Sequence, residues 1–99
     1  MRPAGRDLRP RQVLDMVESG EDHAQHEGRP AIVYRRDDGE AYALGFREDV
    51  NLWKGRGYRP MGTVAFIRDR MAAAEEEGVQ EESVTWFLLK DVEREQESR

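Results

Sequence analysis

Two short apolar runs joined by an acidic glycine turn most constrain the fold of this chain. AIVYRR (31–36) and AYALGF (41–46) flank DDGE (37–40). Val, Ile, Tyr and Phe favour β-strands, and an Asp-Gly turn between two such runs is a strong signal of a β-hairpin. The sequence therefore predicts an antiparallel hairpin near the middle of the chain.

The register of this hairpin has two alternatives. A two-residue loop pairs Val33 with Leu44 and places Tyr34 and Tyr42 on opposite faces. A three-residue loop that ends in a left-handed Gly39 instead pairs Tyr34 with Tyr42. We favour the second register, because it gathers the apolar side chains on one coherent face.

Two helices are expected on either side of the hairpin. The first begins in LRPRQVLDMVESGE (8–21), where Pro10 suits the first turn and Gly20 suits the C-terminal end. The second runs from about residue 63 to 77, with Thr63 as N-cap and Gly78 as terminator. Each carries apolar residues at helical spacing, which indicates a helix with one buried face.

Two further strands are expected, followed by a tail. Residues 50–58 (VNLWKGRGY) are a candidate third strand that Gly55 and Gly57 would weaken. SVTWFLLK (83–90) is rich in β-branched and aromatic residues and apolar on both sides, which predicts a strand inside the sheet. The charged segment DVEREQESR (91–99) contains no aromatic residue and is predicted to be a disordered tail.

These elements predict a small two-layer α+β domain over residues 1–90. The order is helix, strand, strand, an optional third strand, helix and strand, with the helices packed on a mixed or antiparallel sheet. Over residues 31–90 this order, with its DDGE turn, resembles the HicB-like antitoxin domain, a partly open RNase H-like module. The N-terminal helix departs from that family, and the resemblance implies no function for this chain.

The composition excludes several chemistries. The chain contains no cysteine, which excludes thiol nucleophiles, disulfides and cysteine zinc sites. No segment approaches the roughly 18 apolar residues of a membrane span, and no signal peptide is recognised, so we expect a cytoplasmic protein with no membrane partner. Asp and Glu number 21 against 16 Lys and Arg, which argues against binding nucleic acid with the whole surface.

The stretch WKGRGYRP (53–60) is the best candidate for a contact surface. Lys54, Arg56 and Arg59 can form an anion-binding rim, and Trp53 or Tyr58 can offer a stacking face. The structural alternative is a strand end and loop whose rings enter the core while its cations stay in solvent. Because GRG matches no phosphate-binding motif, we favour the structural alternative but keep these five residues as the candidate site.

Other polar clusters have structural explanations. His23 and His26 lie near carboxylates, yet their spacing misses the helical two-histidine zinc motif, so we predict a solvated connector and no metal site. The carboxylates of DDGE are explained by the turn that they form. Glu75–Glu77 are explained as a solvated helix end.

The sequence does not determine the function. It contains no nucleophile or acid–base constellation, and we expect no cofactor, so a small enzyme or metal-dependent protein is the least favoured class. We favour a non-catalytic or regulatory module with a protein partner, because Trp, Tyr and Arg are enriched at binding hot spots. The alternative is binding of RNA or single-stranded DNA through residues 53–59. The oligomeric state stays open.

Overall fold

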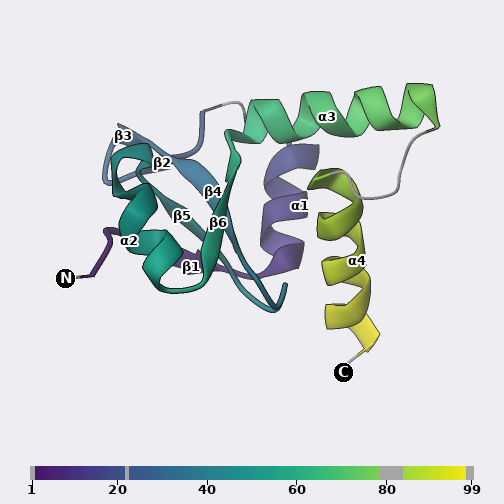
Figure 1. Cartoon of the computed structure of the whole chain (residues 1–99). Coiled ribbons are helices and arrows are strands. Elements are labelled where there is room, and N and C mark those ends of the chain that lie inside the picture. Colours follow the sequence, from purple (N-terminus) through teal and green to yellow (C-terminus); the bar gives the residue numbers. More distant parts are fainter. Residues whose placement is uncertain (1, 22, 79–83, 98–99) are drawn as a thin grey trace.

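The computed structural model describes residues 2–21, 23–78 and 84–97. Over these ranges the chain forms a four-stranded antiparallel sheet, a separate two-stranded sheet and several helices (Figure 1). The α+β class predicted from the sequence is confirmed, and the main sheet has the strand order β1-β5-β4-β6. The elements are β1 (Gly5–Leu8), α1 (Pro10–Glu18), β2 (Gln25–His26), β3 (Arg29–Pro30), β4 (Ile32–Arg36), β5 (Tyr42–Gly45), a 3₁₀ turn (Arg47–Asp49), α2 (Val50–Gly55), β6 (Tyr58–Gly62), α3 (Val64–Glu77) and α4 (Val84–Glu97).

Helices cover both faces of the main sheet. On one face, α1, α3 and α4 pack together and against the strands (Figure 1). The main core on this side includes Val33 and Leu44 of the sheet with Ile67 of α3 and Leu88 of α4. On the opposite face, α2 contributes Trp53 to a second, smaller core. The sheet therefore carries buried apolar side chains on both of its faces.

The hairpin of β4 and β5 has the register that the sequence argument rejected. Val33 lies opposite Leu44, so the predicted pairing of Tyr34 with Tyr42 is wrong. Tyr42 enters the main core and Tyr34 enters the second core. The prediction failed because it assumed a single apolar face, whereas this hairpin supplies buried side chains to two cores.

The turn between β4 and β5 closes around Gly39. The main-chain N–H of Arg36 donates to the carbonyl of Ala41 at 2.9 Å, and the N–H of Gly39 donates to the carbonyl of Arg36 at 2.8 Å. Gly39 has a φ of 72°, the left-handed conformation expected from the sequence. A Cβ atom here would also collide with the carboxylate of Asp91 and the guanidinium of Arg35. Glycine is therefore required for two independent reasons.

The predicted strand over residues 83–90 is wrong where the structure describes it, because residues 84–90 form the first half of α4. Residue 83 lies outside the described residues. In the helix, Leu88 and Val92 share a face and are buried in the main core. A short apolar run suits a buried strand and a helix equally well by periodicity, and the β-branched and aromatic content pointed to the wrong one.

The segment on the C-terminal side of that run is also helical. Residues 91–97, predicted as a disordered tail, continue α4 to Glu97, and residues 98–99 lie outside the described part of the chain. Asp91 and Val92, in the middle of the helix, are buried. The prediction considered charge alone and missed that these residues continue the buried stripe of the preceding apolar run.

Residues 50–58 do not form one strand. Val50–Gly55 form α2, and β6 begins at Tyr58 after a turn at Gly57, whose φ is 86°. The edge strand β1 was not predicted, since GRDL has no alternating apolar pattern and is placed by its pairing with β5. The order within residues 31–90 is thus strand, strand, helix, strand, helix, helix, which differs from the order on which the HicB-like resemblance rested.

Candidate functional site

The two aromatic rings of WKGRGYRP enter the second core. Trp53 is 4 % exposed and stacks on Tyr34 with ring centroids 5.2 Å apart, and Tyr58 meets the indole edge-on at 5.0 Å. Gly5 and Gly45 leave the space that the indole fills, because a Cβ atom at either position would collide with it. Neither ring therefore presents a free face to a ligand.

The cations of the same stretch lie in solvent. Lys54 and Arg56 are exposed at the C-terminal end of α2, where positive charge is favourable for the helix dipole. The side chain of Arg59 is 81 % exposed and its Nε lies 3.0 Å from a carboxylate oxygen of Asp37. The five candidate residues therefore lie in three places: Trp53 and Tyr58 in the second core, Lys54 and Arg56 at the C-terminal end of α2, and Arg59 on β6.

A buried carboxylate that the sequence argument missed ties α4 to the hairpin. Asp91 is 2 % exposed and accepts hydrogen bonds from the hydroxyl of Tyr42 at 2.5 Å, from Nε of Arg35 at 2.7 Å and from the guanidinium of Arg94 at 2.7 Å. A carboxylate can be buried at tolerable cost only when it is paired and hydrogen-bonded in this way. The sequence feature that could have revealed this buried carboxylate is its position three residues after Leu88, on the same face of the helix.

The electrostatics of this network favour a structural role. Burial, assisted by the hydrogen bond to Asp91, raises the pKa of Tyr42 far above its ordinary value. The hydrogen bond to Asp91 raises the pKa of Arg35, although burial acts in the opposite direction. A general acid or base works best when its pKa lies near the working pH. Neither Tyr42 nor Arg35 is therefore suited to proton transfer at neutral pH.

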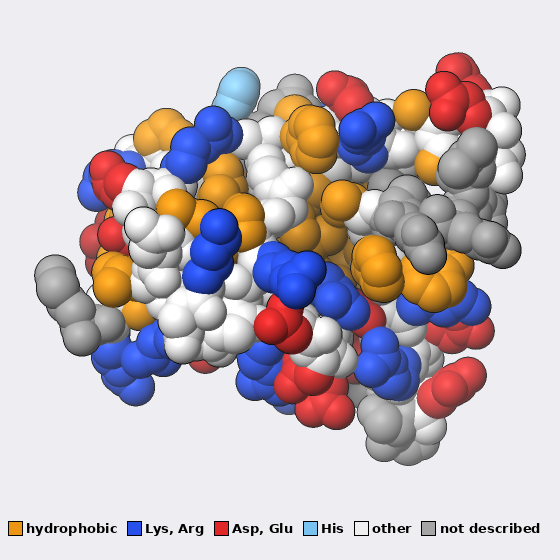
Figure 2. Space-filling view, in the orientation of Figure 1, with side chains coloured by type: hydrophobic (Ala, Val, Ile, Leu, Met, Phe, Trp, Pro, Cys, Tyr) orange, Lys and Arg blue, Asp and Glu red, His pale blue; other side chains and the backbone are white. Residues whose placement is uncertain are grey.

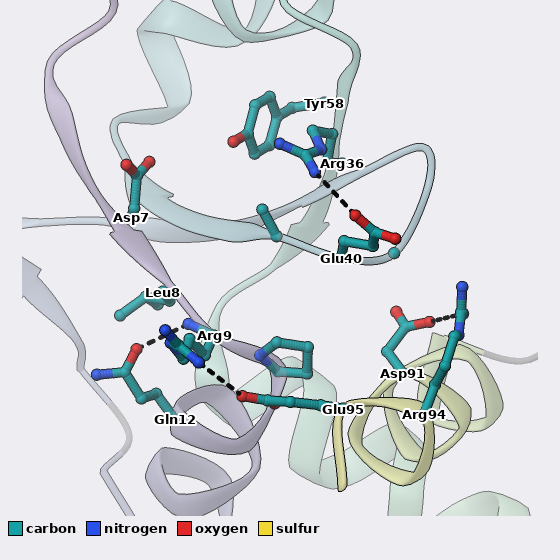
Figure 3. Close-up of a pocket in the computed structure, with 13 residues that line it drawn as sticks. Asp7, Leu8, Arg9, Gln12, Arg36, Glu40, Tyr58, Asp91, Arg94 and Glu95 are labelled. Carbon is teal, nitrogen blue, oxygen red and sulfur yellow. Dashed lines mark hydrogen bonds and ion pairs between the residues drawn. The ribbon is translucent and has the colours of Figure 1, made fainter. Parts of the chain in front are cut away.

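A polar pocket of about 670 Å³ opens beside this network, with side chains from β1, the start of α1, the β4–β5 loop, β6 and α4 around it (Figure 3). Asp7 and Tyr58 lie on one side of it, and Arg94 lies on the other (Figure 3). The arginines on its wall each already contact a carboxylate: Arg9 with Glu95 at 3.8 Å, Arg36 with Asp38 at 2.8 Å and Arg94 with Asp91 at 2.7 Å. The acids that line the pocket, Asp7, Glu40, Asp91 and Glu95, also outnumber its three arginines, so it has little net attraction for an anionic ligand.

A second pocket, of about 490 Å³, lies between β6 and the first turn of α4. We call it the α4–β6 groove. Its wall includes Arg35, Arg59, Pro60, Met61, Val84 and Phe87, together with Asp37. Phe87 is 37 % exposed, and the guanidinium of Arg35 lies over its ring at 5.0 Å from the centroid. This groove differs from the polar pocket because large apolar groups are open to solvent there.

Two further aromatic rings lie near the starts of α3 and α4, Phe66 exposed and Trp86 half-buried. Phe66, at the start of α3, is 46 % exposed and lies under the guanidinium of Arg70 at 5.6 Å. Trp86 packs edge-on against Phe87 at 5.1 Å and lies under the ammonium of Lys90 at 5.8 Å. Figure 2 shows apolar surface near the starts of both helices with basic side chains beside it. We call these three rings, their cations and the groove the aromatic face.

The two histidines differ in their surroundings. His23 is exposed, and His26 is half-buried with its ring tilted against Phe46 at 5.6 Å. Asp22 lies outside the described residues. Within the described ranges, no group of three or more His, Cys, Asp or Glu side chains is placed to hold a metal ion. None of the helices described is long and apolar enough to cross a membrane.

The geometry brings one sequence candidate, Arg59, to the aromatic face and leaves Lys54 and Arg56 at the end of α2. The aromatic face itself was missed, because the segment that supplies Trp86 and Phe87 was expected inside a sheet. Comparisons with protein-family models, with curated proteins and with solved structures found no match for this chain.

Proposed function

We propose that this chain is a small non-catalytic module that binds another protein through the aromatic face. The observation that carries the proposal is the 37 % exposure of Phe87 on the wall of an open groove, together with the 46 % exposure of Phe66 at the start of α3. Large exposed apolar patches mark sites of interaction. Aromatic residues and Arg are also the types enriched at the energetic centres of interfaces.

The non-catalytic part of the proposal is supported by how the polar groups are used. Asp91 is the buried carboxylate of the described chain, and three donors already occupy its oxygens. The arginines of the polar pocket are likewise paired with acids. A catalytic group must be free to reach a substrate or to exchange a proton, and these groups are committed to one another.

Binding of RNA or single-stranded DNA through residues 53–59 stays the alternative. It is supported by the exposed charges of Lys54 and Arg56. It is weakened because base stacking needs an accessible ring, and Trp53 and Tyr58 are only 4 % and 9 % exposed. A cytoplasmic location also stays a prediction.

Site-specific photo-crosslinking in the cells that make the protein tests the proposal. A photoreactive phenylalanine analogue replaces Phe87 in one version and Arg56, exposed at the end of α2, in another. We expect a discrete adduct with one protein from position 87 and none from position 56. Nucleic-acid adducts from position 56 alone would favour the alternative. No protein adduct from position 87 would contradict the proposed function.

A further inference from the structure

We infer that the partner segment is acidic and amphipathic and inserts an apolar side chain into the α4–β6 groove; this inference rests on the proposed protein-binding function. The wall of the groove suits an apolar side chain, because it is lined by Pro60, Met61, Val84 and Phe87. Its volume of about 490 Å³ lies within the range of sites that enclose a ligand group. An extended or helical segment with one large apolar residue would remove this surface from water.

The charges around the groove suit an acidic segment. The cations of the aromatic face are Arg35, Arg59, Arg70 and Lys90, and the acids that contact them are Asp37, Glu93 and the buried Asp91. Over the whole chain the balance is reversed, with 21 acids against 16 cations. Among the described residues the face thus carries one more cation than acid, on a protein whose overall charge is acidic, which favours an acidic partner.

Two of these cations have unused hydrogen-bonding capacity. Arg59 is 81 % exposed and engages Asp37 through Nε, and the ion pair leaves guanidinium donors for a second carboxylate. Arg70 is exposed and contacts the ring of Phe66. A guanidinium can bind a carboxylate in a bidentate manner. Acidic side chains on both sides of the inserted apolar residue would therefore find donors on β6 and on α3.

Two other occupants fit less well. A second copy of the chain, docked by a two-fold axis through the same face, would place one cation-rich face against another. Such like-charge contacts oppose association. A nucleic acid would need open ring faces for its bases, yet Phe66 and Phe87 each already have a guanidinium over one side.

The test uses the full chain and three short synthetic peptides, followed by two-dimensional amide NMR. One peptide is amphipathic with Glu and Asp beside Leu and Phe, the second has every acid replaced by Lys, and the third has Leu and Phe replaced by Ser. We expect only the first to bind, with shifts confined to β6 and the first turns of α3 and α4. Binding of the Lys peptide with equal affinity would overturn the inference.

Two charge-reversal variants sharpen the test. Arg59→Glu reverses a cation on the face, and Arg56→Glu makes the same change on an exposed cation outside it. We expect Arg59→Glu to weaken binding of the acidic peptide about tenfold or more and Arg56→Glu to change it less than about twofold. Equal effects of the two variants would contradict the inference, because they would reflect net charge alone.

The outcomes separate this inference from the proposed function. A protein adduct from position 87 without any shift from the acidic peptide would contradict the inference that the partner segment is acidic. It would still support the proposed protein-binding function. Absence of both would end both proposals. Dimerisation that depends on protein concentration and disappears in Arg59→Glu would identify a second copy as the occupant and would also overturn the inference.

Discussion

Two aromatic segments of this protein use their rings in opposite ways. In residues 53–60, Trp53 is 4 % exposed and lies between Tyr34, Tyr58 and the strands. In residues 84–90, Phe87 is 37 % and Leu89 is 46 % exposed. The first segment is polar and rich in glycine, and the second is nearly all apolar, yet it is the polar segment that buries its rings.

The difference follows from what surrounds each segment. Gly5 and Gly45 are two adjacent positions where the sheet has no side chain, and the indole of Trp53 fills that space. On α4, by contrast, only the stripe that includes Leu88 and Val92 reaches the main core, and a helix must direct its remaining side chains elsewhere. Burial is decided by the partner surface, and the local composition of a segment does not reveal that surface.

The largest expected effect is at Trp53. Trp53→Ala removes a fully packed ring and should lower the free energy of unfolding by about 3–5 kcal/mol, measured by urea denaturation. Trp53→Phe keeps a ring and loses an indole N–H that has no hydrogen-bond partner in the described chain, so a smaller loss is expected. A stable Trp53→Ala protein that no longer binds its partner would instead make residues 53–60 the contact site.

A loss of comparable size is expected at Asp91, which joins the segment of exposed rings to the sheet. Asp91→Ala leaves the buried Tyr42 hydroxyl and the half-buried Arg35 guanidinium without their partner and should cost about 3–5 kcal/mol in the free energy of unfolding. The exposed Glu97 of the same helix is the matched control, and Glu97→Ala should change stability by less than about 0.5 kcal/mol. Equal stability of the two variants would show that α4 is not docked through Asp91.

A smaller effect is expected from alkaline pH. Tyr42 keeps its proton in the folded state above the pH of about 10 at which an unfolded tyrosine ionises, because burial and Asp91 raise its pKa. Ionisation then stabilises the unfolded chain, so stability should be constant up to about pH 10 and fall above it. Chemical denaturation across this range should show a shallower fall in Tyr42→Phe, and an unchanged slope would contradict the assignment.

The smallest effect on stability is expected on the outer side of α4. Leu89→Ser should lower the free energy of unfolding by about 1 kcal/mol, because the side chain is 46 % exposed. Leu88→Ser, one residue earlier, removes a side chain with 0 % exposure and should cost several times more. Thermal melting of the two variants gives the comparison directly. Reversed magnitudes would mean that the helix is rotated or is a strand.

Local signals predicted a good part of the fold. Thr63 caps α3 by accepting a hydrogen bond from the N–H of Phe66 at 3.0 Å, and Gly78 follows the helix with a φ of 68°. Pro10 occupies the first position of α1, and Gly39 adopts the left-handed turn. These features could be predicted because each depends on the conformational preference of one or two neighbouring residues.

Features that depend on distant partners could not be predicted. The register of the hairpin is decided by α2, which supplies a second core for Tyr34. Whether SVTWFLLK is a strand or a helix is decided by the space left beside α1 and α3. For the candidate site, Arg59 could be identified by its charge. Its position beside Phe87 could not, because it depends on Arg59 lying in β6 and on Phe87 lying in a helix.

The most direct test of the account compares solvent access at the two segments in one experiment. A soluble, uncharged paramagnetic probe broadens NMR signals according to their exposure. We predict strong broadening of the Phe87 ring and the Leu89 methyl groups, while the Trp53 indole N–H and the Leu88 methyl groups stay sharp. Broadening of the Trp53 indole with protection of Phe87 and Leu89 would contradict the account. Residues 53–60 would then be the candidate surface for binding a partner.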